Sequence, residues 1–189
     1  MNPTAVARKL LHTRHVACHA YQRSDGLIDI EAELRDITPD GTDLFFKILP
    51  AGMPIHDMRI LMTVNQKLVV QAVTAQMRAT PTPYCPKIES AYAALAGLQI
   101  GAGWRTQVKA RVGGMHGCTH LTELILGTMA TTAVQASLAI ERASPDWPAS
   151  LKKDVTIINS CHSYRSDGEA AKILWSEQRR EQDCSGPVV

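Results

Sequence analysis

The chain has no strong excess of charge of either sign. Its 189 residues carry 20 lysines and arginines against 18 aspartates and glutamates, a formal net charge of +2 at pH 7. Nucleic acids and anionic membranes are bound through clustered positive charge, so this balance predicts neither kind of partner. With 45% hydrophobic residues, the composition is that of a globular protein, and the length suits one domain.

The N-terminus lacks the apolar segment of a secretory signal. The stretch MNPTAVARKLLHTRH contains basic residues but no apolar core, so we expect no signal peptide. One later stretch, residues 121–140, is long enough to cross a membrane. It also carries Glu123, Gln135, Ser137 and four threonines, which oppose insertion. We interpret it as the buried central helix of a soluble, cytoplasmic protein.

The cysteines do not follow a disulfide or zinc-finger pattern. Their number, five, is odd, which argues against a complete disulfide framework, and reduced thiols are expected in a protein without an export signal. The chain contains no C-x-x-C and no H-E-x-x-H motif, which are local signatures of metal sites. Any metal site must therefore be assembled by folding from residues that are distant in the sequence.

Alternating apolar and polar residues predict a β-sheet in the N-terminal part. Apolar and charged residues alternate along residues 28–35, as in a strand with one buried and one wet face. The preceding segment HVACHAYQ can pair with this strand in a hairpin, and alternation returns at 58–64. Turn signals separate these segments. We predict a meander of four or five antiparallel strands that ends near residue 79.

Helical signals follow the predicted sheet. Cys85 precedes a proline, which is favoured at the first helical position, and an apolar stripe follows it at Ile88, Tyr92, Leu95 and Leu98. A short helix is expected at 104–112, where Gly113 and Gly114 end it. A long helix is expected from Cys118 to Arg142.

The C-terminal part predicts one more strand and one more helix. Residues 155–159, VTIIN, form an apolar segment typical of a buried strand. Ser166 and Glu169 fit a capping box that would begin a helix. We predict a single α+β domain over residues 1–180, an antiparallel sheet followed by helices packed on one face, and a disordered tail at 181–189.

Three cysteines occupy similar positions in the predicted fold. Cys85 and Cys118 lie at the start of a predicted helix, and Cys161 lies between a strand and a helix. Helix N-termini stabilise a thiolate, the species that binds metal or attacks an electrophile. Each cysteine alone is better explained as a small buried hydrophobe, but the shared setting, with His120 near Cys118, favours a site. Zinc and iron take cysteine and histidine ligands. We therefore predict a metal site with the ligands Cys85, Cys118, Cys161 and His162.

Two residues near Cys118 are candidates for catalysis. Glu123 is a carboxylate in the first turns of an apolar helix, where it can act as a general base or a metal ligand, or only complement the helix dipole. His120 can complete a metal shell or move protons.

The remaining histidines carry no clear signal. His56 and Asp57 open a strand, so their side chains face either the end of the sheet or plain solvent, and we favour solvent. His12 and His15 are expected on the surface.

Five segments resemble an uncharacterised bacterial family of unknown function, the one numbered 2889. They are, in order, DGLIDIEAELRD, HDMRILMTV, YCPKIESAYAALAGLQIGAGWR, GCTHLTEL and SCHSYRSDG, within roughly residues 12–170. The resemblance implies a small cytoplasmic bacterial protein and no particular reaction. The family pattern falls on six positions chosen above on chemical grounds: Cys85, Cys118, His120, Glu123, Cys161 and His162.

The chain departs from the family pattern in the segment ELILG, which is one residue longer. An extra residue would rotate the rest of the helix by about 100° or be absorbed as a π-bulge. A fainter resemblance, in architecture alone, is to iron–sulfur cluster scaffold proteins. These have a sheet followed by helices and an adjoining His-Cys pair, which is reversed here as Cys161-His162.

Three functional hypotheses follow. The first is a metal-dependent lyase or hydrolase that holds zinc or iron and acts on a small molecule with Glu123 as base. The second is a scaffold or carrier for an iron–sulfur cluster or a single metal. The third is a metal-free enzyme with Cys118 as nucleophile and His120 or His162 as base. We favour the first, because the sheet and long helix can wall a pocket, and the sequence is compatible with a homodimer.

Overall fold

The computed structural model describes residues 6–145 and 158–175. The chain divides into two compact units, Met1–Ala136 and Ser137–Val189. The predicted extent of a single domain, to residue 180, stays a prediction. The predicted tail at 181–189 lies outside the described residues.

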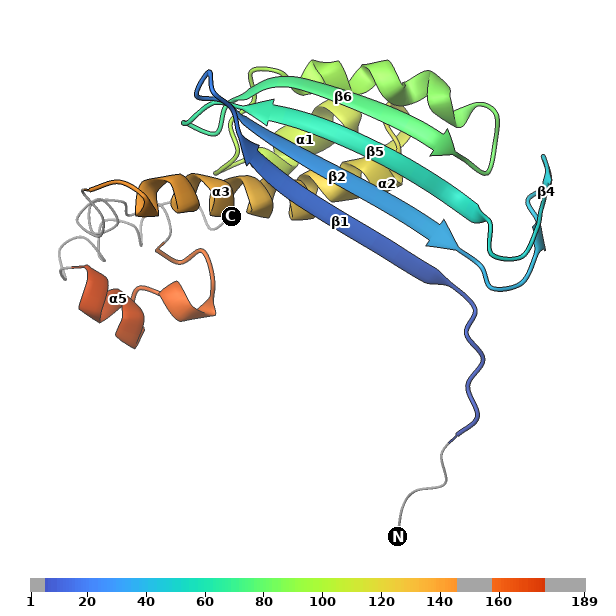
Figure 1. Ribbon diagram of the computed structural model, residues 1–189. Helices are drawn as coiled ribbons and strands as arrows, with labels where there is room; N and C mark the ends of the chain where they lie inside the picture. The colour runs from blue at the N-terminus through green and yellow to red at the C-terminus, as the bar shows by residue number, and fades with distance from the viewer. Residues whose placement is uncertain (1–5, 146–157, 176–189) are drawn as a thin grey trace, which may run out of the picture. The chain divides into compact units, whose positions relative to one another are not determined.

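The first unit is built on a four-stranded antiparallel sheet (Figure 1). Its spatial order is β1-β2-β5-β6, and the strands are β1 (Thr13–Gln22), β2 (Ile28–Ile37), β5 (Pro54–Val64) and β6 (Val70–Ala79). The connection between β2 and β5 contains a separate small ribbon of β3 (Thr42–Asp43) and β4 (Ile48–Leu49). The predicted meander that ends near residue 79 is confirmed.

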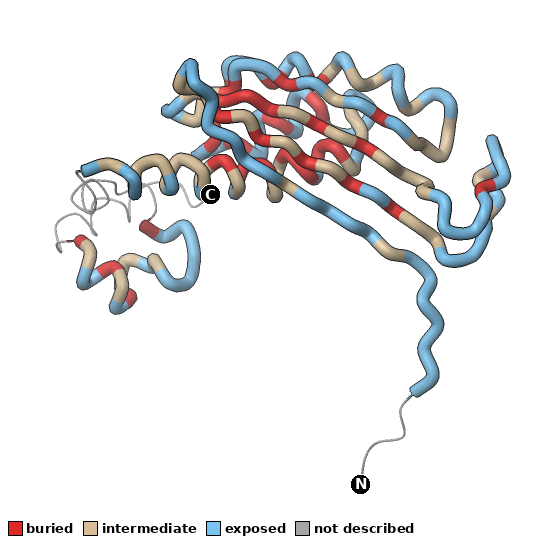
Figure 2. The backbone as a smooth tube through the Cα atoms, viewed as in Figure 1, coloured by how far each residue is buried: buried red, intermediate tan, exposed pale blue. Residues whose placement is uncertain are grey.

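One face of the sheet is the core. On β2, the four apolar residues that alternate with charges are at most 2% exposed: Ile28, Ile30, Ala32 and Leu34. On β5, the corresponding row is Met58, Ile60, Met62 and Val64. Figure 2 shows these buried positions along the two central strands. Burial of each large apolar side chain contributes roughly 1.5–3 kcal/mol, so this face holds the helices on the sheet.

Helices follow the sheet and cover its apolar face, so the predicted α+β class is confirmed (Figure 1). They are η1 (Cys85–Leu95), α1 (Trp104–Val112), η2 (Gly114–His116), α2 (Thr119–Leu124), η3 (Ile125–Met129) and α3 (Ala130–Arg142). The first of them, η1, is a 3₁₀-helix. With three residues per turn, Tyr92 and Leu95 lie on one face, and both are fully buried.

A π-helical segment begins within the sequence ELILG. The helix that begins with α2 passes through one π-helical segment, η3, and continues as α3. The Thr131 hydroxyl, in the first turn of α3, lies 3.0 and 3.1 Å from the carbonyl oxygens of Gly127 and Thr128. A π-bulge, one of the two outcomes expected for an extra residue in ELILG, is thus present in the helix.

The combined helix Thr119–Arg142 passes a test for a membrane span by length and by a mean hydropathy of 1.3. It is the one helix among residues 6–145 and 158–175 that does so. Its first half belongs to the core, because Leu121, Ile125 and Met129 are fully buried. Over the most apolar window of the helix, 28% is buried.

The second unit carries a small core of its own. Ile158, Ala171 and Trp175 are buried there, with Tyr164 and Leu174 packed against them. Its described residues contain the last part of α3, from Ser137, together with η4 (His162–Tyr164) and α5 (Glu169–Leu174). Gly168 is the N-cap of α5 and no side chain caps the helix, so the predicted capping box does not form. Most of the strand predicted at 155–159 lies outside the described residues.

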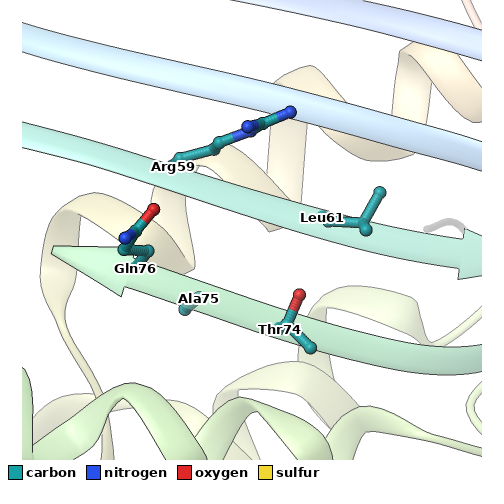
Figure 3. A pocket seen from close by; sticks show the side chains of 5 residues that line it. All are labelled: Arg59, Leu61, Thr74, Ala75 and Gln76. Carbon is teal, nitrogen blue, oxygen red and sulfur yellow. The ribbon is translucent and has the colours of Figure 1, made fainter.

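The uncovered face of the sheet is polar. A hollow of about 460 Å³ lies on it over β5 and β6, lined by Arg59, Leu61, Thr74, Ala75 and Gln76 (Figure 3). The charged member, Arg59, donates to Glu31 at 2.7 Å. None of the lining residues is a histidine, cysteine or carboxylate, so this hollow has the properties of a solvated sheet face rather than of a reactive site.

Candidate metal centre

An aspartate continues the buried row of β2. Asp36 is two residues beyond Leu34 and is only 1% exposed. A buried carboxylate is unfavourable unless charged or hydrogen-bonding groups surround it. Its neighbours therefore decide what this end of the sheet can do.

Strand register places two of these neighbours. Arg14 on β1 and His56 on β5 lie directly opposite Asp36, one on each side. Arg14 donates from Nε to Oδ1 at 2.7 Å and from Nη2 to Oδ2 at 2.8 Å, which is a bidentate pair. His56 Nδ1 lies 3.0 Å from Oδ2, and His12 Nε2, just before β1, lies 3.1 Å from Oδ1.

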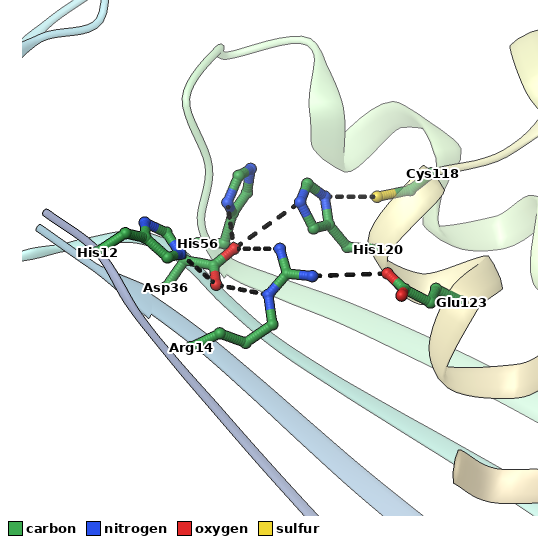
Figure 4. A network of polar contacts seen from close by, with 7 residues as sticks. All are labelled: His12, Arg14, Asp36, His56, Cys118, His120 and Glu123. Atoms are coloured by element: carbon green, nitrogen blue, oxygen red, sulfur yellow. Dashed lines mark hydrogen bonds and ion pairs between the residues drawn. The ribbon is translucent and has the colours of Figure 1, made fainter. Parts of the chain in front are cut away.

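Helix α2 adds further residues to the cluster, from the right in Figure 4. His120 Nε2 lies 3.7 Å from Asp36 Oδ2, and its ring centroid is 4.0 Å from that of His56. The other nitrogen of His120, Nδ1, is 3.9 Å from the sulfur of Cys118. One turn further, Glu123 Oε2 is 3.5 Å from Arg14 Nη1.

The start of α2 is held in place by contacts from the core. Tyr92, which is fully buried, accepts a hydrogen bond from the Cys118 amide at 2.8 Å and donates one to its carbonyl oxygen at 3.0 Å. The preceding residue is Gly117, where a Cβ would collide with the carbonyl oxygen of Val112. The chain can therefore make this close approach only with glycine, and His120 is positioned by a rigid support.

The surroundings favour the protonation states that bind metal. Burial alone would raise the pKa of Asp36, but hydrogen bonds from Arg14 and His12 outweigh it and hold that pKa well below its ordinary value of 3.8. Burial lowers the pKa of His56 below 6.5, and the neighbouring His120 lowers it further. Burial, then the charge of Arg14, lowers the pKa of His120. At neutral pH the cluster thus offers a carboxylate and two neutral imidazoles.

The geometry of these three groups is that of a possible metal centre. Each of Asp36, His56 and His120 offers one ligand atom, and these atoms lie within 4.8 Å of one another. Two histidines and one carboxylate are the ligand set of open, mononuclear iron(II) and zinc sites. Three protein ligands leave coordination positions for water or a substrate. We refer to Asp36, His56 and His120 as the triad.

The sequence prediction reached part of this site. His120 and Glu123, the predicted catalytic residues, lie beside the triad, and Cys118 contacts His120. Cys85 lies at the start of η1, with its sulfur 3.3 Å from the Thr82 hydroxyl. In the described part of the chain, the triad is the one group of three or more such ligand atoms, and it contains no cysteine.

Cys161 and His162 belong to the second unit. Cys161 is exposed and precedes η4, so all three predicted cysteines do begin helical segments. The metal site predicted from Cys85, Cys118, Cys161 and His162 stays a prediction.

Asp36 and His56 were missed as site residues, although the alternation contains a signal for both. Asp36 is in phase with the buried residues of β2, and His56 is in phase with Met58 and Ile60 on β5. A polar side chain that alternates with core residues points into the core and needs polar partners there. The expectation that His56 faces solvent did not take this alternation into account. The His56 side chain is only 14% exposed. His12 is on the surface, as expected, but it also contacts Asp36.

Residues 12–135 match the model of a protein family described as a protein of unknown function (DUF2889). The matched region begins at His12, contains the whole triad with Cys118 and Glu123, and nearly coincides with the first unit. It ends before Cys161, so it is shorter than the resemblance over roughly residues 12–170 suggested. No curated protein and no solved structure matches the chain.

Proposed function

The chain belongs to the family of proteins of unknown function DUF2889, and we propose that it is a metal-dependent enzyme that acts on a small molecule at the triad. The observation that carries this proposal is the convergence of Asp36, His56 and His120 from two strands and a helix within 4.8 Å. The metal is zinc or iron(II), because both are bound by imidazole and carboxylate.

Each neighbouring residue has a role in this proposal. The open coordination positions would polarise a carbonyl or lower the pKa of a bound water, as in metal-dependent lyases and hydrolases. Glu123, exposed and one helical turn from His120, is the general base. Cys118 contacts the ring nitrogen of His120 that faces away from Asp36 and orients that ring.

The ligand types favour a single ion over an iron–sulfur cluster. Such clusters are held mainly by cysteine thiolates, and the triad supplies nitrogen and oxygen. The iron–sulfur scaffold is therefore the less supported form of the metal-binding hypothesis.

Cobalt(II) substitution tests the proposal. We expect the purified protein to take up one cobalt ion per chain, with an absorption spectrum that lacks a thiolate-to-metal charge-transfer band. The His56→Ala variant should lose the ion, while Cys85→Ser and the matched control His15→Ala, whose side chain is exposed, should retain it. Cobalt retained by His56→Ala and lost by Cys85→Ser would refute the triad and support the cysteine site.

One contact favours a second candidate, metal-free catalysis by Cys118. Its sulfur lies at the N-cap of α2 and 3.9 Å from the Nδ1 atom of His120, an arrangement of nucleophile and base. Alkylation by iodoacetamide at pH 6 in the presence of a chelator tests this. A catalytic Cys118 should react faster than the exposed Cys161 and slow down in His120→Ala; equal rates would remove this candidate.

A further inference from the structure

A cleft is linked to the triad through Arg14. Its volume is about 80 Å³, and it is lined by Arg14, Val16, Leu34, Glu123, Leu124 and Thr128. Arg14 contacts Asp36 of the triad and also lines this cleft, which we call the side cleft. Figure 4 shows Arg14 between Asp36 and Glu123. A molecule that contacts Arg14 in the side cleft would therefore share this guanidinium with Asp36 of the triad.

The lining of the side cleft is mixed in chemistry. Arg14 and Glu123 are charged, whereas Val16, Leu34 and Leu124 are apolar. Leu34 and Leu124 are almost fully buried, and Val16 is 44% exposed. A ligand that matches this lining has one polar end and a short apolar chain. The volume of about 80 Å³ restricts it to a small molecule.

The charges around the side cleft determine which charge the polar end of the ligand carries. Arg14 is positive, and the carboxylates of Asp36 and Glu123 are negative. A divalent ion at the triad reverses this balance and leaves a single net positive charge, so the metal-loaded site attracts an anion. The contact between Arg14 and Glu123 is long, 3.5 Å, and Glu123 is 69% exposed, so a ligand carboxylate can take the place of Glu123 on the Nη1 atom.

The π-helical segment supplies the remaining wall. Thr128 lies in the π-helical segment η3 and lines the side cleft. Wide turns of this kind occur frequently at functional sites. The π-helical segment thus forms part of the wall of the side cleft.

We propose that the side cleft binds a short-chain monocarboxylate, with the carboxylate on Arg14 facing the metal and the chain against Val16, Leu34 and Leu124. This inference rests on the proposed function, since it needs the ion at the triad. The substrate is therefore a small aliphatic acid, and the group that the metal activates lies near the carboxylate.

Butyrate is a suitable probe, with butylammonium as the control of opposite charge. Titration of the zinc-loaded protein, followed by ¹H–¹⁵N NMR, should give saturable shifts at the amides of Val16, Leu124 and Thr128. Butylammonium should give none, and removal of zinc should weaken butyrate binding at least about tenfold. Binding of butylammonium in preference to butyrate would overturn the assignment.

Two variants that fill the side cleft locate the binding site. Val16→Phe and Thr128→Leu should each weaken butyrate binding by about tenfold or more and leave the zinc content unchanged. Ala20→Phe is the matched control, because Ala20 is exposed on the same side of β1 and does not line the side cleft. Unchanged binding in both filled variants would overturn the proposal.

Failure of this proposal is distinguishable from failure of the proposed function. If the protein binds zinc at the triad but shows no butyrate-induced shifts, only the proposed substrate class is refuted. If it binds no zinc, both the substrate class and the proposed function are refuted.

Discussion

The two ends of one buried sheet face are chemically opposite. At one end, Ile30 of β2 lies beside Met62 of β5, and both are fully buried. At the other end, the same two rows reach Asp36 and His56, which also lie side by side. The backbone register is nearly continuous, so the fold places a charged cluster where the apolar core would otherwise go on. We call these the apolar end and the charged end.

The comparison separates stability from function. The apolar end stabilises the folded state because its side chains remove apolar surface from water. This contribution is not specific to any function. The charged end gains little from burial, because Asp36 must be desolvated before Arg14 and the histidines compensate it. Its residues are better explained by chemistry than by folding, and the apolar end supplies the stability that it requires.

The largest expected effect is at the centre of the charged end. Asp36→Ala leaves Arg14 and His56 without their shared partner, so we expect the free energy of unfolding to fall by about 3–5 kcal/mol and metal binding to be lost. Urea denaturation and metal analysis measure the two effects. A loss below about 1 kcal/mol would mean that solvent already compensates these groups.

A cavity at the apolar end should affect stability alone. Ile60→Ala is expected to lower the free energy of unfolding by about 2–5 kcal/mol, because Ile60 is fully buried. The metal content per folded chain should not change. If Ile60→Ala released the metal as readily as Asp36→Ala, the two ends would not be separable.

The pH dependence of stability should come from the charged end. The folded pKa of His56 and His120 lies below 6.5, so between pH 7 and 5 the unfolded chain takes up protons that the folded chain does not. In the chelated protein, the free energy of unfolding should therefore fall as pH falls through this range. His56→Ala should fall less steeply, and identical slopes would contradict the assignment.

Titration of Asp36 should lower the free energy of unfolding further at more acidic pH. Its folded pKa lies well below 3.8, so its contribution is complete above that value and disappears as the pH falls toward the folded pKa. The isosteric variant Asp36→Asn, which cannot titrate, should lack this acid branch in urea denaturation from pH 5 to 3.

The smallest effect is expected on the polar face of β1. His15→Ala, at an exposed position, should change the free energy of unfolding by less than about 0.5 kcal/mol and leave metal binding unaltered. This variant checks that the loss expected for His56→Ala depends on position rather than on the removal of any histidine.

Local patterns predicted the elements of this fold well. Alternation identified β2 and β5, the proline after Cys85 marked the start of η1, and a π-bulge was one of two outcomes expected for the segment ELILG. These features depend on residues a few positions apart, which is the range over which sequence patterns are informative.

The site was less predictable because strand register assembles it. Arg14, Asp36 and His56 form one row only when three strands pair in a particular alignment, and β2 has an irregularity just after Asp36. His120 was identified from its neighbour Cys118, yet its other partner, Asp36, is 84 positions earlier in the sequence. The cysteines were predicted as ligands because they lie at the starts of predicted helices, which is a local feature of the sequence. The triad instead forms through contacts between residues that are distant in the sequence.

Anomalous X-ray diffraction from crystals of the zinc-loaded protein would locate the ion. We predict one peak about 2.0–2.2 Å from His56 Nδ1, His120 Nε2 and a carboxylate oxygen of Asp36, with Arg14 displaced from that oxygen. A peak bonded instead to the sulfurs of Cys85, Cys118 or Cys161, with Asp36 still held by Arg14, would contradict it.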